Sequence, residues 1–483
     1  MRFPLAGGYI GQEHSRSQRA KRHQVDCLAV VWLEGKICTA GDEMMCDRWT
    51  SLVLSATTLA LCGQTQSLKP AEHSTAPYIS VKEPITLLSA NEGVSDILWR
   101  RTPEGLIDFE MKTPDSFTVI RLWPDRPPTS KTVYGTVPCT IAGTPTMAIS
   151  GDGRFGLITN HGCQSESWGP LRYPEDQPLT NADIRPEDMS KQKLAPPRSD
   201  MVSMIDLASP EFRVVDRVLF DDQPTHVLPH PDGEHFVVGA SVCFYVFRIE
   251  NGKLVEVSRS RHDRGHPCFW ITPRGDRIIA THANWATVDR AATVDWYAFT
   301  PQAVSHRGEV RIQEGVDTQL TPETGILRVS PDGRKALICQ DSSPSSGRLT
   351  DILVVDLTQD PPVINAVIKQ VAHGTESFAF HPNGKMAVAT CLGYIGLNKN
   401  SIAILDIASD PPRLLYHMDA SGSLQGIEFT PEGDKLLVGS TFAHRIEVFD
   451  VVGDYHLRKS DKVLITGHGH CSLTVGPTYA AER

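Results

Sequence analysis

The stretch Leu327–Cys339, "LRVSPDGRKALIC", contains two short runs of alternating apolar residues separated by Pro331-Asp332-Gly333. Side chains alternate between the two faces of a strand, so each run predicts a strand. An Asx-Gly pair between two such runs is typical of a β-hairpin with a two-residue turn, in which both central residues have positive φ. A third alternating run, Asp351–Leu357 ("DILVVDL"), follows. The hairpin is therefore expected to belong to a larger antiparallel sheet.

The same hairpin pattern occurs six times along the chain. The six copies are "MAISGDGRFGLITN" (147–160), "HVLPHPDGEHFVVGA" (226–240), "CFWITPRGDRIIATH" (268–282), "LRVSPDGRKALICQ" (327–340), "FAFHPNGKMAVATC" (378–391) and "IEFTPEGDKLLVGS" (427–440). Each is followed by a third strand and then a more polar fourth strand. Repeats of about fifty residues with four antiparallel strands predict the blades of a β-propeller.

Two unmatched segments predict a seventh blade. Ser116–Val137 resembles the third and fourth strands of a blade, and Cys471–Gly476 resembles a first strand with no successor. We expect N- and C-terminal strands to pair and close an all-β, seven-bladed β-propeller, because closure removes the exposed sheet edges. The second strand of this blade is expected to be either "VSDILWRR" (94–101) or "GLIDFEM" (105–111), and the sequence leaves the choice open.

The N-terminal region does not fit the blade pattern. We interpret residues 1–43 as a leader or disordered tail, 44–63 as a signal peptide around the apolar block Ser51–Leu61, and 64–84 as a linker. The propeller is expected to span 85–478, with a proline-rich rim loop inserted at 163–199. These assignments predict a periplasmic or secreted protein. Whether Met44 or Met45 is the true start, whether Cys62 is lipidated, and whether the apolar block is instead a short buried helix stay open.

Composition narrows the classes of partner. The net charge is −10 and no basic cluster accompanies the blades, which argues against nucleic acid as a partner. No apolar stretch is long enough for a transmembrane helix. Seven cysteines follow residue 63 without a CxxC pair, so they resemble small core residues more than a disulfide framework. We expect a monomer without a cofactor.

The blade repeat resembles that of the bacterial YVTN-repeat and lactonase-like seven-bladed propellers. The resemblance rests on "SPDGRKALIC…DILVVDL", "HPNGKMAVAT…SIAILDI" and "TPEGDKLLVGS…RIEVFDV", and it covers residues 85–478. It implies a family that includes sugar-lactone hydrolases, other enzymes and secreted proteins that only bind. No catalytic motif beyond the repeat can be transferred to this chain.

The starts of first strands and the ends of second strands are expected at one rim, together with the long loops. That rim is where binding residues would gather. The candidate catalytic residues there are His161, His226, His266, His282, His373, Glu376 and His470, and the candidate ligand-binding residues are Trp168, Tyr173, Trp285, Gln340, Tyr394 and Gln425. Imidazoles at a channel mouth can transfer protons or bind metal, but structural roles at strand ends are common, and we assign no metal.

Two functions remain. The first is an exported binding scaffold whose loop-rich rim holds a small molecule or a protein partner. The alternative is a lactonase-like hydrolase that acts at the mouth of the central channel through His and Glu acid–base groups. Convergence of His, Glu and Arg on a pocket would favour the enzyme, and a shallow, apolar or loop-plugged rim would favour binding. Histidine rings that stay apart and each bond a backbone carbonyl would be structural and would argue against the enzyme.

Overall fold

The computed structural model describes residues 73–74, 76–93, 99–101, 107–109, 114–138, 145–160, 200–262, 264–283, 293–312, 326–339, 349–372, 374–391, 401–422 and 424–480. The chain divides into two compact units, Met1–Thr65 and Gln66–Arg483, and every described residue belongs to the second. No described helix is long and apolar enough to cross a bilayer. The predicted leader, signal peptide and insertion loop 163–199 lie outside the described residues.

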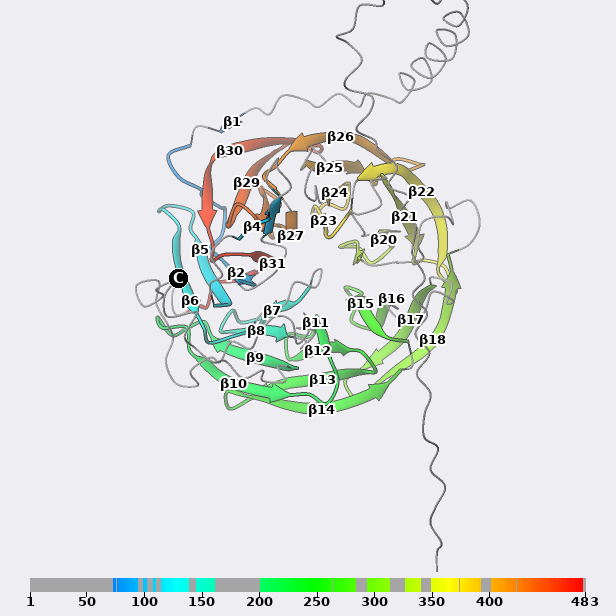
Figure 1. Cartoon of the computed structure of the whole chain (residues 1–483). Helices are drawn as coiled ribbons and strands as arrows, with labels where there is room; N and C mark the ends of the chain where they lie inside the picture. Colours follow the sequence, from blue (N-terminus) through cyan, green and yellow to red (C-terminus); the bar gives the residue numbers. More distant parts are fainter. Residues whose placement is uncertain are drawn as a thin grey trace, which may run out of the picture. The chain divides into compact units, whose positions relative to one another are not determined.

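The described strands form seven four-stranded blades in a ring (Figure 1), as predicted. Three blades come from residues 147–311. They are β7–β10 (Met147–Ile149, Phe155–Asn160, Met201–Asp206, Val214–Leu219), β11–β14 (Pro224–Pro229, His235–Ala240, Cys243–Glu250, Lys253–Arg261) and β15–β18 (His266–Ile271, Arg277–Ala283, Thr293–Thr300, Ala303–Arg311). We number them blades 1 to 3.

Blades 4 to 6 follow in the same order, with the innermost strand first. They are β19–β22 (Leu327–Val329, Lys335–Cys339, Thr350–Asp356, Val363–Ala372), β23–β26 (Phe378–Phe380, Met386–Cys391, Ser401–Asp406, Arg413–Asp419) and β27–β30 (Leu424–Phe429, Lys435–Ser440, Arg445–Val452, His456–Ile465). Blade 6 carries a fifth strand, because β1 (His73–Ser74) pairs in parallel with the outer strand β30.

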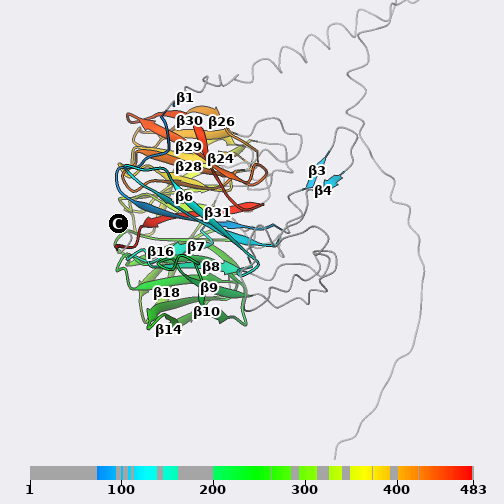
Figure 2. The same ribbon diagram turned by 90° about the vertical axis from the view of Figure 1, so that its left-hand side faces the viewer.

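Blade 7 joins the N- and C-terminal ends of the ring, as predicted. Figure 2 shows the blades from the side. Its order is β31 (His470–Pro477), β2 (Ile85–Asn91), β5 (Ser116–Leu122) and β6 (Thr129–Tyr134). Both predicted candidates for its second strand are wrong, because that strand is β2. Trp99–Arg101 (β3) and Ile107–Phe109 (β4) instead pair with each other in a separate two-stranded sheet.

The hairpin turns also differ from the prediction. In blade 4, Gly333 has φ 71° and donates its N–H to the carbonyl of Ser330 at 2.9 Å, whereas Asp332 does not have positive φ. The same pattern holds at the other five turn glycines. Only the glycine is left-handed, and the aspartate instead accepts hydrogen bonds from Ser330 Oγ (2.6 Å) and the Arg334 N–H (3.0 Å). These turns therefore have one left-handed residue, as in wider hairpin loops.

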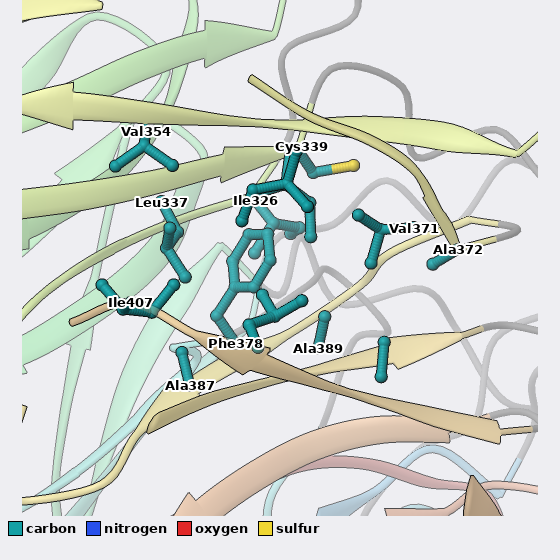
Figure 3. Close-up of a cluster of buried hydrophobic side chains, with 14 of the residues drawn as sticks. Ile326, Leu337, Cys339, Val354, Val371, Ala372, Phe378, Ala387, Ala389 and Ile407 are labelled. Atoms are coloured by element: carbon teal, nitrogen blue, oxygen red, sulfur yellow. The ribbon is translucent and has the colours of Figure 1, made fainter. Parts of the chain in front are cut away.

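Apolar side chains fill the spaces between blades. Figure 3 shows the cluster between blades 4 and 5, where Phe378 lies among Ile326, Leu337, Ala387 and Ile407. Phe378 is only 1% exposed, which shows how tightly the innermost strand packs between its neighbours. Because each innermost strand is fixed from both sides, the residues at its start are held in place at the mouth of the channel.

Candidate functional site at the mouth of the central channel

The innermost strands begin at one rim of the ring and end at the other. The ending rim carries the tight turns, and these contact one another from blade to blade: a Cβ on Gly333 would lie 2.9 Å from Pro273, and one on Gly153 would lie 2.2 Å from the carbonyl oxygen of Pro477. The beginning rim is where the sequence places the candidate residues. Its long loops at 161–199, 284–292, 340–348 and 392–400 lie outside the described residues.

Many of the predicted site residues cannot be placed in this geometry. His161, Trp168, Tyr173, Trp285, Gln340, His373 and Tyr394 lie outside the described residues. For His266 and His282 the backbone is described: His266 begins β15 opposite Ala283, and His282 in β16 pairs with Pro267. Their roles stay predictions. The described site candidates with described side chains are His226, Glu376, Gln425 and His470.

His470 is a structural residue of the closing blade. It is fully buried, and its Nδ1 lies 2.8 Å from Ser89 Oγ of β2, which donates in turn to Asn91 Oδ1 (2.8 Å). Burial lowers the pKa of His470 to about 4. The ring is therefore neutral at physiological pH. Its hydrogen bond with Ser89 joins β31 to β2, which argues against a role in proton transfer.

His226 also lies within the protein rather than at an open surface. It is 7% exposed, its Nδ1 lies 3.1 Å from Thr225 Oγ1, and its ring meets the edge of Phe269 with centroids 6.5 Å apart. Phe269 belongs to β15, so His226 packs between the innermost strands of blades 2 and 3.

Glu376 has the environment expected of an acid–base group. It lies two residues before β23, is partly buried, and receives no hydrogen bond or ion pair at its carboxyl from the described residues. Burial raises the pKa of this carboxyl to about 8. Its charge also acts on Cys268 of blade 3, whose pKa burial raises to about 12.

Buried polar atoms without partners surround the same mouth. Gln425 is 1% exposed, and neither its amide oxygen nor its amide nitrogen has a hydrogen-bond partner among the described residues. The hydroxyls of Thr146, Thr375 and Ser472, all at most 1% exposed, share this condition. They lie at the starts of the innermost strands of blades 1, 5 and 7. Buried polar groups are nearly always paired, so such a group indicates water or a bound polar molecule.

A hydrogen bond connects the backbone at Gln425 to the backbone at Glu376. The N–H of Gly426 donates to Ser377 Oγ at 3.1 Å, and Ser377 Oγ donates to the carbonyl of Glu376 at 2.6 Å. Gly426 has φ 77°, and a Cβ there would lie 2.8 Å from the Leu473 nitrogen of β31. The left-handed glycine makes a bulge in β27, at which the register shifts between Leu424 and Ile427. This bulge places the backbone at Gln425 next to the backbone at Glu376.

Deeper in the channel lies an ion pair that the sequence analysis did not identify. Arg328 of β19 donates from both terminal nitrogens to the two carboxylate oxygens of Glu428 in β27, each at 2.6 Å. Its guanidinium also donates to the carbonyl of Phe378 (3.2 Å) and lies 4.1 Å from the ring centre of Trp270. The pair thus connects blades 3 to 6 across the channel. A charged residue between two core residues of an innermost strand is the sequence signal that could have revealed this ion pair.

One described cluster has the spacing of metal ligands, namely Asp295, His306 and Glu309 on β17 and β18. Arg264 contacts both acids, at 3.3 Å from Asp295 and more closely at Glu309, and His306 Nε2 lies 2.8 Å from Asp295. The guanidinium already supplies positive charge to the carboxylates. We therefore interpret this cluster as an ion-pair network on the outer strands of blade 3.

Comparison with solved structures finds the same fold in bacterial proteins. A candidate 6-phosphogluconolactonase of Bacteroides uniformis matches with TM-score 0.55 and 13% identity over 82% of this chain and 100% of its own. One from Bacteroides fragilis gives 0.53 and 13% over 82% and 98%. The periplasmic gluconolactonase of Pseudomonas aeruginosa gives 0.51 and 15% over 81% and 99%. At these identities the likeness concerns the fold.

No family model matches the sequence. No curated protein matches it either. The relation to the YVTN-repeat proteins therefore stays a prediction. The proposal that follows depends on the residues at the channel mouth.

Proposed function

We propose that this protein hydrolyses a lactone at the mouth of the central channel, with Glu376 as the group that transfers the proton. The observation that carries the proposal is the Glu376 carboxyl itself. It is partly buried and lacks a partner among the described residues, and its backbone adjoins that of Gln425, whose buried amide has no partner among the described residues either. A structural ion pair does not explain such a carboxyl, whereas a general acid requires one.

The raised pKa decides which form acts. With a pKa of about 8, Glu376 holds its proton at neutral pH and serves as an acid. Water attacks the lactone carbonyl carbon and forms a new C–O bond, and the ring C–O bond then breaks. Glu376 donates its proton to the leaving ring oxygen, and the proton released by the attacking water returns to the carboxylate. The product is a hydroxy acid, and no other reactant is needed.

Two further observations, which do not concern the Glu376 carboxyl, support the proposed hydrolysis. Three solved propellers of the same fold carry lactonase names, which makes cyclic esters the first substrates to test. The unpaired hydroxyls of Thr146, Thr375 and Ser472 offer hydrogen bonds to a polar molecule. The other predicted function, a binding scaffold without chemistry, would use the same polar groups and differs only in the absence of turnover.

The test is acid release measured in a pH-stat with gluconolactone, 6-phosphogluconolactone and an unsubstituted six-membered lactone. We expect the wild type to exceed the spontaneous rate with at least one of them, and Glu376→Gln to lower kcat by about 10²- to 10⁴-fold, the contribution typical of general acid–base catalysis. Glu432→Gln, at an exposed glutamate of a tight turn, is the matched control and should leave the rate unchanged. Binding without turnover in the wild type would support the scaffold instead.

Export is a second proposal, independent of the chemistry. The apolar block after Met44, followed by Ala60 and Cys62, motivates it. N-terminal sequencing of the protein made in its own host should find a mature chain that begins near Gly63. A cytoplasmic protein that begins at Met1 would contradict it.

A further inference from the structure

We infer that Gln425 is a second catalytic residue, whose side-chain N–H donates to the lactone carbonyl oxygen as negative charge develops on it. This inference rests on the proposed hydrolysis and assigns the group that stabilises its tetrahedral intermediate. Glu376 alone can protonate the leaving oxygen, but it leaves the carbonyl oxygen without a donor. Oxyanion stabilisation by a fixed donor is a large contribution in acyl-transfer enzymes.

The Gln425 amide is not used by the fold among the described residues. Its side chain is buried, yet neither polar atom bonds to the described residues. An apolar residue of the same length would fill this position without leaving buried donors and acceptors unsatisfied. The hydroxyls of Thr146, Thr375 and Ser472 can rotate toward a nearby carbonyl or water. A planar amide can change the direction of its donors only by turning the whole group.

The backbone of Gln425 is held rigidly. Gly426 occupies a left-handed conformation against Leu473 with no room for a side chain. A Cβ at Gly439 would lie 2.3 Å from the same Gln425 carbonyl oxygen. Strands β28 and β31 therefore enclose the peptide from two sides. A donor on such a support needs no reorganisation as the reaction proceeds, which is the condition for oxyanion stabilisation.

The backbone at Gln425 also lies close to the backbone at Glu376, the proposed general acid. The Gly426 N–H bonds to Ser377 Oγ, so the residues that precede these two, Gln425 and Glu376, leave neighbouring points of adjacent innermost strands. The lactone carbonyl oxygen and the lactone ring oxygen are both bonded to the same carbon. Two side chains on adjacent backbones, as those of Gln425 and Glu376 are, can supply one donor to each of these atoms.

The chemistry divides between the two residues. As water adds to the carbonyl carbon, the carbonyl π electrons move to the oxygen, and the Gln425 N–H stabilises the resulting negative charge without giving up its proton. When the carbonyl re-forms, the ring C–O bond breaks and Glu376 protonates the departing oxygen. Gln425 is unchanged at the end of the cycle.

The decisive variant is Gln425→Met, which keeps the length of the side chain and removes the donor. We expect kcat for the turned-over lactone to fall by about 10²- to 10³-fold, the effect of losing one oxyanion donor, with KM changed little. We also expect the melting temperature to stay equal or to rise, because the unsatisfied amide is gone. Gln359→Met, at an exposed glutamine, is the control for the substitution itself. Gln425→Leu serves as a second variant if the methionine protein does not fold.

The outcomes separate this inference from the proposed function. Loss of kcat with an unchanged or raised melting temperature supports both. A Gln425→Met enzyme as active as wild type, alongside an inactive Glu376→Gln enzyme, overturns the role of Gln425 and leaves the proposed function standing. A melting temperature that falls together with kcat in both Gln425 variants makes the residue structural and overturns the inference. Absence of wild-type turnover overturns both.

Discussion

The ring nitrogen Nε2 of His230, in the tight turn of blade 2, lies 2.9 Å from the carbonyl oxygen of Gly275, the turn glycine of blade 3. Its Nδ1 accepts the N–H of Asp232 at 3.2 Å, so Nε2 carries the hydrogen and donates. His381 of blade 5 repeats this arrangement with the carbonyl of Gly433 at 3.0 Å and the N–H of Asn383 at 3.2 Å. A histidine that precedes Pro-Asx-Gly therefore forms a hydrogen bond between the turn of its own blade and the turn of the next blade.

These two histidines provide a paired prediction. His230→Ala and His381→Ala should each lower the free energy of unfolding by about 1 kcal/mol for the lost hydrogen bond, with some further loss of packing. Because the residues belong to separate blades, the double variant should show the sum of the two effects. Urea unfolding of the three variants would check it. A double variant no less stable than either single one would contradict independent fastening of the turns.

Gly439 should tolerate no side chain. A Cβ at this position would lie 1.7 Å from His470 Nε2 and 2.3 Å from the Gln425 carbonyl oxygen. Gly439→Ala should therefore displace β31 or β27 and lower the melting temperature clearly, with a loss on the order of 1–3 kcal/mol typical of overpacked sites. Gly252→Asn, at a left-handed glycine in open space, should have little effect. Equal stability of the two variants would show that the blade 6–7 contact is looser than described.

The Arg328–Glu428 pair should behave as a buried ion pair. Both side chains are 15% exposed, so removal of one partner leaves a charge with few alternatives. Arg328→Met or Glu428→Gln alone should lower the free energy of unfolding by about 3–5 kcal/mol. The double variant should recover part of this loss, because no unpaired charge remains. Chemical denaturation of the four proteins gives the coupling, and strictly additive losses would argue against a direct interaction.

Stability should depend on pH through Glu376. The pKa of this carboxyl is raised from an ordinary 4.5 to about 8, so above pH 4.5 the unfolded chain releases a proton that the folded protein keeps. The free energy of unfolding should therefore fall as the pH rises from 4.5 to 8. Glu376→Gln should remove this contribution and flatten the profile. Thermal melts of wild type, Glu376→Gln and the control Glu432→Gln across that range would test it. Equal slopes for wild type and Glu376→Gln would contradict the raised pKa.

Local patterns predicted most of the fold, because a blade is built from strands that follow one another in the chain. The prediction failed where pairing is remote. Strand β2 reads "ITLLSAN" and is buried along its whole length, so it lacks the alternation of a half-exposed strand. Only its pairing with the remote strand β31 identifies β2 as the second strand of blade 7. The turn conformation was also predicted wrongly, because an Asx-Gly pair does not by itself fix the length of the hairpin loop.

For the candidate site, the sequence could indicate which rim of the ring holds the residues, but not which of these residues contact one another. Glu376 and Gln425 were named because they lie at or near the start of innermost strands, and the structure brings their backbones together. His470 was named by the same rule, yet it is buried against β2 and β27. The Arg328–Glu428 pair joins residues 100 positions apart across the ring. Neither spacing nor composition reports contacts of that kind.

The closing blade also determines when the site can exist during folding. Thr86 of β2 bonds to Thr478 across a separation of 392 residues, whereas in each of the other six blades the four main strands are neighbours in sequence. Contacts at such a separation form late, because a long loop must be closed first. Leu473, against which Gly426 packs beside Gln425, arrives with that last strand. A partly assembled ring would thus hold Glu376 on a finished blade 5 but no oriented Gln425, so activity would appear only with the final closure of the ring.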